Sequence, residues 1–543
     1  MTERASILAP FRHDTFRMLW LGTLISNLGG LVQAVGAGWM MTTLTTSHNM
    51  VALVQASNTL PIMVFSIAAG ALADNFDRRS VMLVAQCGMA MVSLALAVTA
   101  FMGLLNPWLL LTFTFLIGCG TALFNPSWQA SMGDIVPRED LAGAVTLNAM
   151  GFNMMRSVGP AVGGLIVAFA GASAAFAVNA ATYMGLIAAL LRWKPERSKP
   201  RLPRETLGSA MGAGIRYVSM SPNLLTVLFR GLLFGFAAIV VLALLPVVAE
   251  QYVGGGALVY GTLLGAFGLG AIGGAFLNGR MRARFGNEAI VRLASLGFAA
   301  AMVGLAFSRD PLLSHFVLLP AGACWVLSLS LFNVSIQLSA PRWVVGRALS
   351  LYQTATFGGM AAGSWIWGIT ADAWGPNWAL VAAACVLVLC AAVGLRLPLP
   401  QFNDRDLNPL DTFNEPMLKL DLRPRSGPIL IMVDYRIAQS DIPRFLGLMS
   451  ERRRIRIRDG ARQWSLLRDL EQPDLWVESY HVPTWVDYVR HNLRRTKADA
   501  DNIEQLRALH QGADLPVVHR MIERQTVPLD DRTPLRDSPE VAP

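Results

Sequence analysis

Two arginines, Arg156 and Arg230, stand within long apolar stretches of this chain of 543 residues. A guanidinium inside a membrane span is costly unless it faces water or a partner, so both arginines are candidates for contact with a solute. No Asp or Glu lies deep in the apolar stretches of the first half, and two cations without a deep acid favour an anionic solute. The structural alternative is that either side chain extends toward the membrane surface or caps backbone carbonyls.

Eight amide side chains in the same apolar stretches are candidates for lining the same cavity. Each of them is equally well explained as a hydrogen bond between two helices. They are Asn27, Gln33, Asn58, Asn125, Asn153, Asn333, Gln337 and Gln353.

A charged loop separates two of the apolar stretches and contains Gly70, Asp74, Arg78 and Arg79. Asp74 follows the first stretch directly, where the negative end of a helix dipole requires a cationic or N–H partner for its carboxylate. Arg78 and Arg79 are close enough in sequence to be that partner and would hold the loop on the cytoplasmic side. An ordinary charged loop between two spans is the alternative.

Small residues form a second motif inside another apolar stretch. It consists of Gly159, Pro160, Gly163 and Gly164. Glycines at this spacing allow two helices to approach closely, and the proline allows the helix to bend.

The composition is that of a polytopic membrane protein, because 53% of the residues are hydrophobic, only 15% are charged, and the mean hydropathy is +0.44. Apolar stretches of about 20 residues, the length that crosses a bilayer, recur about twelve times between Phe16 and Leu397. The five cysteines all lie in such stretches without metal-ligand spacing, so neither a metal nor another cofactor is expected.

The positive charge is distributed unevenly along the chain. Lys and Arg gather in alternate loops, whereas the loops at 42–48, 104–107 and 171–174 contain none. This is the positive-inside pattern, and it predicts a multi-pass protein of the cell inner membrane with both termini in the cytoplasm. A nucleic-acid partner is therefore not needed to explain the net charge of +9.

The two halves of the apolar region are related to each other. The tripeptide Leu-Phe-Asn occurs at 123–125 and at 331–333, and the dipeptide Pro-Arg occurs at 137–138 and at 341–342. Several matches at nearly one offset predict two parallel six-helix halves around a central site.

The chain after residue 427 is charged and soluble in character. Strands at 429–435, 464–470, 475–482 and 517–522, with helices at 440–456 and from 484, fit a ferredoxin-like unit. The arginines between 452 and 458 are most simply a solvated or membrane-facing surface. His491, Trp464 and Trp485 are candidates for lining a pocket, although an aromatic core is the alternative.

The expected fold is therefore an all-α polytopic membrane protein with about twelve transmembrane helices in two six-helix pseudo-repeats, followed by an α+β ferredoxin-like cytoplasmic domain. The expected parts are 1–192 for the N-terminal half, 193–222 for a basic cytoplasmic linker, 223–398 for the C-terminal half, 399–426 for a second linker, 427–525 for the α+β domain and 526–543 for a disordered tail.

The motifs above resemble those of major facilitator superfamily transporters. The loop at 70–79 is similar to the loop between the second and third helices of that family, which latches the two halves in one of two states. The motif at 159–164 resembles the fifth-helix motif of the family's exporting antiporters. Thr114, however, occupies the position of an arginine that those antiporters often carry, so a proton-coupled mechanism has no evident carrier here.

Further motifs at 124–126, 136–139 and 153–160, together with the charged tail, resemble the branch of transmembrane secretion effectors that includes the enterobactin exporters. The tail resembles domains of the antibiotic-biosynthesis monooxygenase type, which pair into dimeric barrels. His491 falls where that domain family commonly has a helix histidine.

The resemblance implies a secondary active exporter that moves a small organic molecule, siderophore-like or drug-like, across the inner membrane by alternating access, and no enzymatic activity. The alternatives are an importer of the same fold, or a fusion whose C-terminal domain is a cofactor-free monooxygenase-like enzyme. The expected partners are membrane lipids, a small-molecule substrate and a second copy of the chain through the C-terminal domain, without nucleic acid.

Overall fold

The computed structural model describes residues 8–137, 139–194, 207–341, 343–400 and 422–523, except residue 513, and isolated positions between 407 and 420. Arg138, Arg342, most of both predicted linkers and the predicted tail lie outside the described residues. Gly70, Asp74 and Asn153 lie in described helices, but their side-chain surroundings are outside the description.

The first set of membrane helices follows the apolar stretches of the sequence. After a short 3-10 turn, η1 (Ala9–Arg12), the helices are α1 (Asp14–Leu44), α2 (His48–Asn75), α3 (Arg78–Phe101), α4 (Pro107–Ile135) and α5 (Leu141–Arg192). Polar residues in the loops start these helices, because the side chains of Ser47, Asp77 and Asn106 accept hydrogen bonds from the first turns of α2, α3 and α4. Gly171 divides α5 into two membrane spans by adopting a φ of +79°, which favours glycine.

The second set repeats this arrangement. Its helices are α7 (Pro222–Val247), which continues into a π turn (Val248–Tyr252), α8 (Ala257–Arg284), α9 (Asn287–Phe307), α10 (Pro311–Ser339), α11 (Val345–Trp374) and α12 (Pro376–Arg396).

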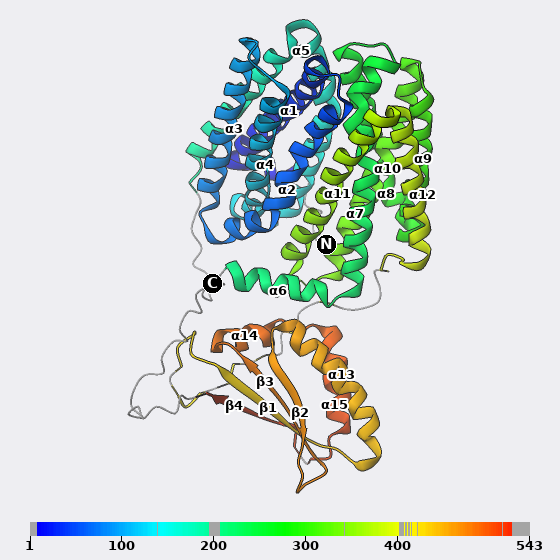
Figure 1. Cartoon of the computed structure of the whole chain (residues 1–543). Coiled ribbons are helices and arrows are strands. Elements are labelled where there is room, and N and C mark those ends of the chain that lie inside the picture. Colours follow the sequence, from blue (N-terminus) through cyan, green and yellow to red (C-terminus); the bar gives the residue numbers. More distant parts are fainter. Residues whose placement is uncertain are drawn as a thin grey trace. The chain divides into compact units, whose positions relative to one another are not determined.

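The two helix sets confirm the prediction of two six-helix halves, with α5 counted as two spans (Figure 1). Within the described part of the chain, nine helices are long and apolar enough to cross a membrane, and α5 is one of them. The helices α2 and α11 accompany these nine with lengths of 28 and 30 residues.

The chain forms two compact units. One unit holds the helices of both sets, and the other holds α6 (Leu207–Ser219), the connection between α10 and α11, and the C-terminal domain. In the second unit the aromatic rings of Tyr217 and Trp343 meet edge to face, 5.4 Å apart. The guanidinium of Arg458 lies 5.2 Å from the Tyr217 ring, and that of Arg494 lies 4.1 Å from the Trp343 ring. Cation–π contacts thus join the C-terminal domain to α6 and to the α10–α11 connection.

The C-terminal domain has the predicted β-α-β-β-α-β order. Its strands are β1 (Ile429–Arg436), β2 (Arg462–Arg468), β3 (Leu475–Val482) and β4 (Val517–Ile522), and its helices are α13 (Ile442–Asp459), α14 (Trp485–Leu493) and α15 (Lys497–Leu509). The strands pair antiparallel in the order β2-β3-β1-β4, so the α+β prediction is confirmed (Figure 1).

One face of this sheet forms the domain core. Alternate residues of β1, such as Ile431 and Val433, are buried with Phe445 and Met449 of α13. The predicted second helix is two helices, because Thr496 and Asp499 form a capping box that starts α15 after α14 has ended.

Candidate functional site

The small-residue motif of α5 lies where this helix crosses α1 and α8. A Cβ atom added to Gly163 would lie 3.0 Å from the Cα of Val32 in α1, and one added to Gly164 would lie 2.8 Å from the Cα of Gly261 in α8. Gly163 therefore lets α5 approach α1 within the first set, and Gly164 lets it touch α8 of the second set, as small residues do between membrane helices.

Arg156 lies on the same helix, close to this crossing. Its guanidinium carbon is 5.9 Å from the centre of the Trp325 ring of α10, and its carbonyl oxygen is next to Gly268 of α8. Among the described residues, Arg156 makes no ion pair or side-chain hydrogen bond. The structure therefore places a cation, without a counter-ion among the described residues, where α5 of the first set meets α8 and α10 of the second.

Arg230 has a different environment from Arg156. The prediction that both arginines lack an acidic partner is wrong for Arg230. It is buried in α7, forms an ion pair with Glu288 in the first turn of α9, and donates to the carbonyl of Leu397 at 3.3 Å. Glu288 also accepts a hydrogen bond of 2.9 Å from the backbone of Leu399. Arg230 thus joins α7 to the start of α9 and the end of α12 within the second set, which is the structural alternative.

The candidate amides are distributed among several environments. Gln33 accepts hydrogen bonds from Ser93, at 2.8 Å, and from Asn179, and so connects α1, α3 and α5 inside the first set. This is a helix-to-helix hydrogen-bond network. The others are half-buried (Asn27, Asn58, Asn333 and Gln353) or exposed (Asn125 and Gln337).

The charged segment between α2 and α3 leads into two arginines at the start of α3, Arg78 and Arg79. Both bind the ends of other helices in the first set. Arg78 donates to the carboxylate of Asp134 and to the carbonyl of Ala130 in α4, both at 2.8 Å. Arg79 donates to the last carbonyls of α5, those of Leu190 and Leu191, at 2.8 and 2.9 Å. Such contacts stabilise the negative ends of two helices.

At the opposite end of α2, its first turn contacts α11 through hydrogen bonds that the sequence did not predict. Asp372 of α11 accepts hydrogen bonds from Ser47 Oγ at 2.8 Å and from the backbone N–H groups of His48 at 2.6 Å and Asn49 at 3.2 Å. These donors form the start of α2, where the helix dipole favours a carboxylate. We name this group the Asp372 latch, because it joins the first helix set to the second. The sequence does show an acid near the end of one apolar stretch, Asp372, and a polar residue before another stretch in the other half, Ser47.

In the C-terminal domain, a buried carboxylate organises several charged side chains. Glu478 of β3 has no exposed surface and accepts hydrogen bonds from Arg456 Nε at 3.0 Å and Trp464 Nε1 at 3.1 Å. Arg452 lies 3.6 Å away. Burial opposes ionisation of Glu478, but the two arginines outweigh it and lower its pKa to about 2. The prediction that the arginines between 452 and 458 form a solvated or membrane-facing surface is wrong for Arg452 and Arg456, which are buried, whereas Arg453 and Arg454 are exposed.

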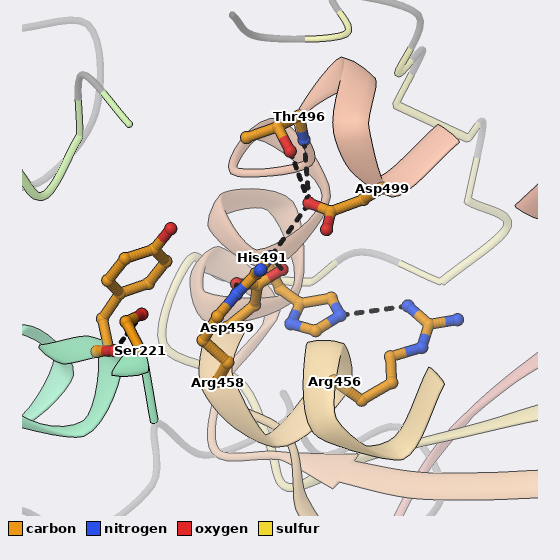
Figure 2. A network of polar contacts seen from close by, with 8 residues as sticks. Ser221, Arg456, Arg458, Asp459, His491, Thr496 and Asp499 are labelled. Atoms are coloured by element: carbon orange, nitrogen blue, oxygen red, sulfur yellow. Dashed lines mark hydrogen bonds and ion pairs between the residues drawn. The ribbon is translucent and has the colours of Figure 1, made fainter. Parts of the chain in front are cut away.

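The predicted pocket residues of this domain do not share one environment. His491 is buried, and its Nε2 lies 3.0 Å from Arg456 (Figure 2). Trp464 contacts Glu478, whereas Trp485 donates to Glu415 at 2.9 Å. Figure 2 also shows Arg458, which bonds to Asp459 and Asp499 and thereby ties the end of α13 to the start of α15.

The environment of His491 predicts that the stability of the C-terminal domain depends on pH. Burial and the adjacent charges of Arg456 and Arg495 hold the pKa of His491 well below its ordinary value, so the folded domain keeps it neutral. A histidine in the unfolded chain takes up a proton near pH 6.5, whereas His491 in the folded domain stays neutral. As pH falls below about 6.5, protonation therefore favours the unfolded state and the domain loses stability. We expect the melting temperature of the domain to fall between about pH 7 and about pH 5, and His491→Gln to flatten that decrease. Tryptophan fluorescence during heating measures it, with His481→Gln on the opposite face of β3 as the control. An unchanged slope in His491→Gln would contradict the assignment.

Comparison with known proteins places the whole arrangement in a family. Residues 5–526 match the major facilitator family described as "Transmembrane secretion effector". The chain belongs to this family. It is 29% identical to the enterobactin exporter EntS of Shigella flexneri over 365 residues, covering 65% of this chain and 84% of that protein. It is 25% identical to macrolide efflux protein A of Streptococcus pyogenes over 274 residues, covering 47% of this chain and 66% of that protein.

Solved structures support the same fold for the helical unit of this secretion effector. A bacterial homologue of the human lysosomal transporter Spinster, in an inward-facing and unoccupied conformation, superposes with a TM-score of 0.57 at 14% identity. The match covers 70% of this chain and 96% of that structure. The chain is therefore a multi-pass membrane transporter of the major facilitator fold, as its resemblances predicted.

The α5–α8 crossing gives a direct test of helix packing in this transporter. Gly164→Val places side-chain atoms against the Gly261 backbone, which cannot yield without separating the helices. Overpacking of this kind costs about 1 to 3 kcal/mol, so we expect transport to fall roughly tenfold or more in sealed vesicles. Gly185→Val in the second span of α5 is the control, because a Cβ atom there meets nothing within 4 Å. Equal transport by both variants would show that the crossing tolerates separation.

Proposed function

We propose that this transporter exports a small organic molecule, preferentially an anion, across the cell inner membrane by alternating access. The observation that carries the proposal is the uncompensated guanidinium of Arg156 where the two helix sets meet. A cation held in an apolar interior attracts an anionic solute group, since no other described charge neutralises it. The names of the relatives, an enterobactin exporter and a macrolide efflux protein, support the outward direction.

Both termini face the cytoplasm in this proposal, because the basic loops follow the positive-inside pattern. The Asp372 latch then lies at the extracytoplasmic ends of the helices, where it holds α2 against α11. Alternating access requires this contact to break when the extracytoplasmic side opens. The charged loop after α2 lies at the cytoplasmic end, where the family resemblance gives Asp74 a latching role in the other state.

The direction of transport is tested by deleting the gene and profiling compounds that disappear from the medium. The compound so identified is then offered to inside-out vesicles, in which an exporter accumulates it. Accumulation only in right-side-out vesicles or intact cells would identify an importer and overturn the proposal. Purified full-length protein in liposomes of matched composition separates the transporter's own activity from that of other membrane proteins.

The Asp372 latch can be weakened without changing its shape. Asp372→Asn removes the charge that strengthens three hydrogen bonds at the start of α2, and loss of a charged hydrogen bond costs about 1.5 to 3 kcal/mol. We therefore expect about a tenfold or greater shift toward the state open on this side. A cysteine introduced at Ala52, which is buried next to Gly368, should react faster with a membrane-impermeant maleimide.

The matched control for this variant is Glu250→Gln. Glu250 is an exposed acid in the π turn after α7, at the same end of the helix bundle. The labelling rate of the cysteine at position 52 should not change in this control. If Asp372→Asn also leaves the rate unchanged, the latch does not hold the closed state.

The C-terminal domain is proposed to associate with a second copy of itself. The face of its sheet that does not cover the core carries Leu467, Val517 and Met521, of which 53%, 53% and 48% of the surface is exposed. An exposed apolar sheet face is a candidate interface, and the related domains pair through their sheets. Met521→Glu should then shift the purified transporter from dimer to monomer in mass photometry, whereas a dimer that persists would place the interface elsewhere.

A further inference from the structure

The C-terminal domain contains a pocket lined only by residues that follow the membrane helices. Its volume is about 420 Å³, which lies within the range of small-molecule sites. The sheet supplies Val433 and Tyr435 from β1 and Tyr480 from β3, and α13, α14 and α15 supply the opposite wall. The pocket therefore lies between the inner face of the sheet and its helices.

The wall of this pocket is strongly basic. Five arginines line it, and no Asp or Glu is among the described lining residues. The arginines are Arg452, Arg456, Arg495, Arg507 and Arg520. Glu478 lies behind the wall, pairs with Arg456 and Arg452, and offsets one of the five positive charges. The pocket therefore has a net positive charge.

The remaining arginines differ in how they are held. Arg520 donates to the hydroxyl of Tyr488 at 2.7 Å and to the carbonyl of Val518 at 3.3 Å, neither of which neutralises its charge. Arg495 and Arg507 form no ion pair or side-chain hydrogen bond with any residue that the structure describes. Burial and repulsion from Arg456 and Arg452 lower the pKa of Arg495 to about 10, which indicates a cation without a counter-ion.

The rest of the wall is apolar and aromatic. Phe413 packs edge to face against Tyr488, with 6.0 Å between the rings, and Leu493, Ile503 and Val518 complete an apolar side. A ligand that fits this wall needs an anionic head for the arginines and a flat apolar body for the rings. A guanidinium binds a carboxylate through two parallel hydrogen bonds, so a carboxylate is the head group that this geometry suits best.

We propose that this pocket binds a small aromatic carboxylate, with Arg495 and Arg507 as the residues that hold its carboxylate group. The site is separate from the one proposed for transport, because Arg156 lies in α5 and the pocket is built only from residues after 409. A ligand there would bind the cytoplasmic domain of the transporter and not the transport pathway.

The test is isothermal titration calorimetry of the full-length protein in nanodiscs, with 1-naphthoate and its neutral counterpart 1-naphthamide as probes. We expect naphthoate to bind and naphthamide to bind at least about tenfold more weakly, since only the first can pair with a guanidinium. Arg495→Gln and Arg507→Gln should each raise the Kd for naphthoate about tenfold or more. Arg507 is exposed, so its replacement should not disturb folding even if that of Arg495 does.

Two further variants locate the site. Arg453→Gln changes an exposed arginine on the other face of α13 and should leave the Kd unchanged. Arg156→Gln changes the transport pathway and should also leave it unchanged. The proposal is overturned if naphthoate fails to bind even at millimolar concentration. It is also overturned if naphthamide binds equally well, or if Arg156→Gln abolishes binding while Arg495→Gln and Arg507→Gln do not.

Discussion

Arg156→Gln should reduce transport of an anionic substrate about 10- to 100-fold while leaving the amount of inserted protein unchanged. The guanidinium lies beside Trp325 and has no described counter-ion, so the substrate itself would be the partner that compensates it. Glutamine keeps a hydrogen-bond donor on a shorter side chain and removes the charge. A neutral ester or amide of the exported compound should therefore lose much less transport than the compound itself.

Two comparisons make this result specific. Arg156→Lys keeps the charge without the planar fork and should restore part of the activity. Arg309→Gln, in the loop between α9 and α10 where the arginine lies 4.0 Å from the Tyr252 ring, should have little effect. Equal loss for the anionic and the neutral compound, or loss of inserted protein, would assign Arg156 to helix packing.

Glu478→Gln should destabilise the C-terminal domain by about 3 to 5 kcal/mol, because it leaves buried cations without a counter-ion. Arg456 and Arg452 are 3% and 5% exposed, so water cannot replace the lost carboxylate. For a domain of this size the change corresponds to a lower melting temperature by roughly 10 °C or more. Tryptophan fluorescence reports it, since Trp464 bonds directly to Glu478.

The control for this variant is Glu471→Gln in the exposed turn between β2 and β3. It removes the same charge from the same domain without uncovering a buried arginine. A melting temperature that falls equally in both variants would mean that net charge, and not the buried ion pair, determines stability.

The sequence alone predicted the elements of this fold, because hydrophobic length and alternation act locally. The apolar stretches became the membrane helices, and the strands at 475–482 and 517–522 have the predicted bounds. The predicted family was confirmed over residues 5–526.

The site was predicted less well, because its contacts join residues far apart in the chain. Arg230 and Glu288 are separated by 58 positions, and Ser47 and Asp372 by 325, so no local pattern pairs them. The buried arginines of α13 were missed for a related reason. A run of arginines resembles a solvated surface until Glu478 of β3 is placed beneath it.

The contacts of Tyr217 and Trp343 with the C-terminal domain form late in the synthesis of the protein. Both rings belong to segments that leave the ribosome long before Arg458 and Arg494, which cover them in the finished protein. During synthesis these two aromatic rings therefore gain these contacts only after the C-terminal domain has been synthesised. A nascent chain that stalls after α12 leaves these rings uncovered by the C-terminal domain, and chaperones and proteases recognise exposed aromatic surfaces. The α+β domain thus completes the packing of segments synthesised before it.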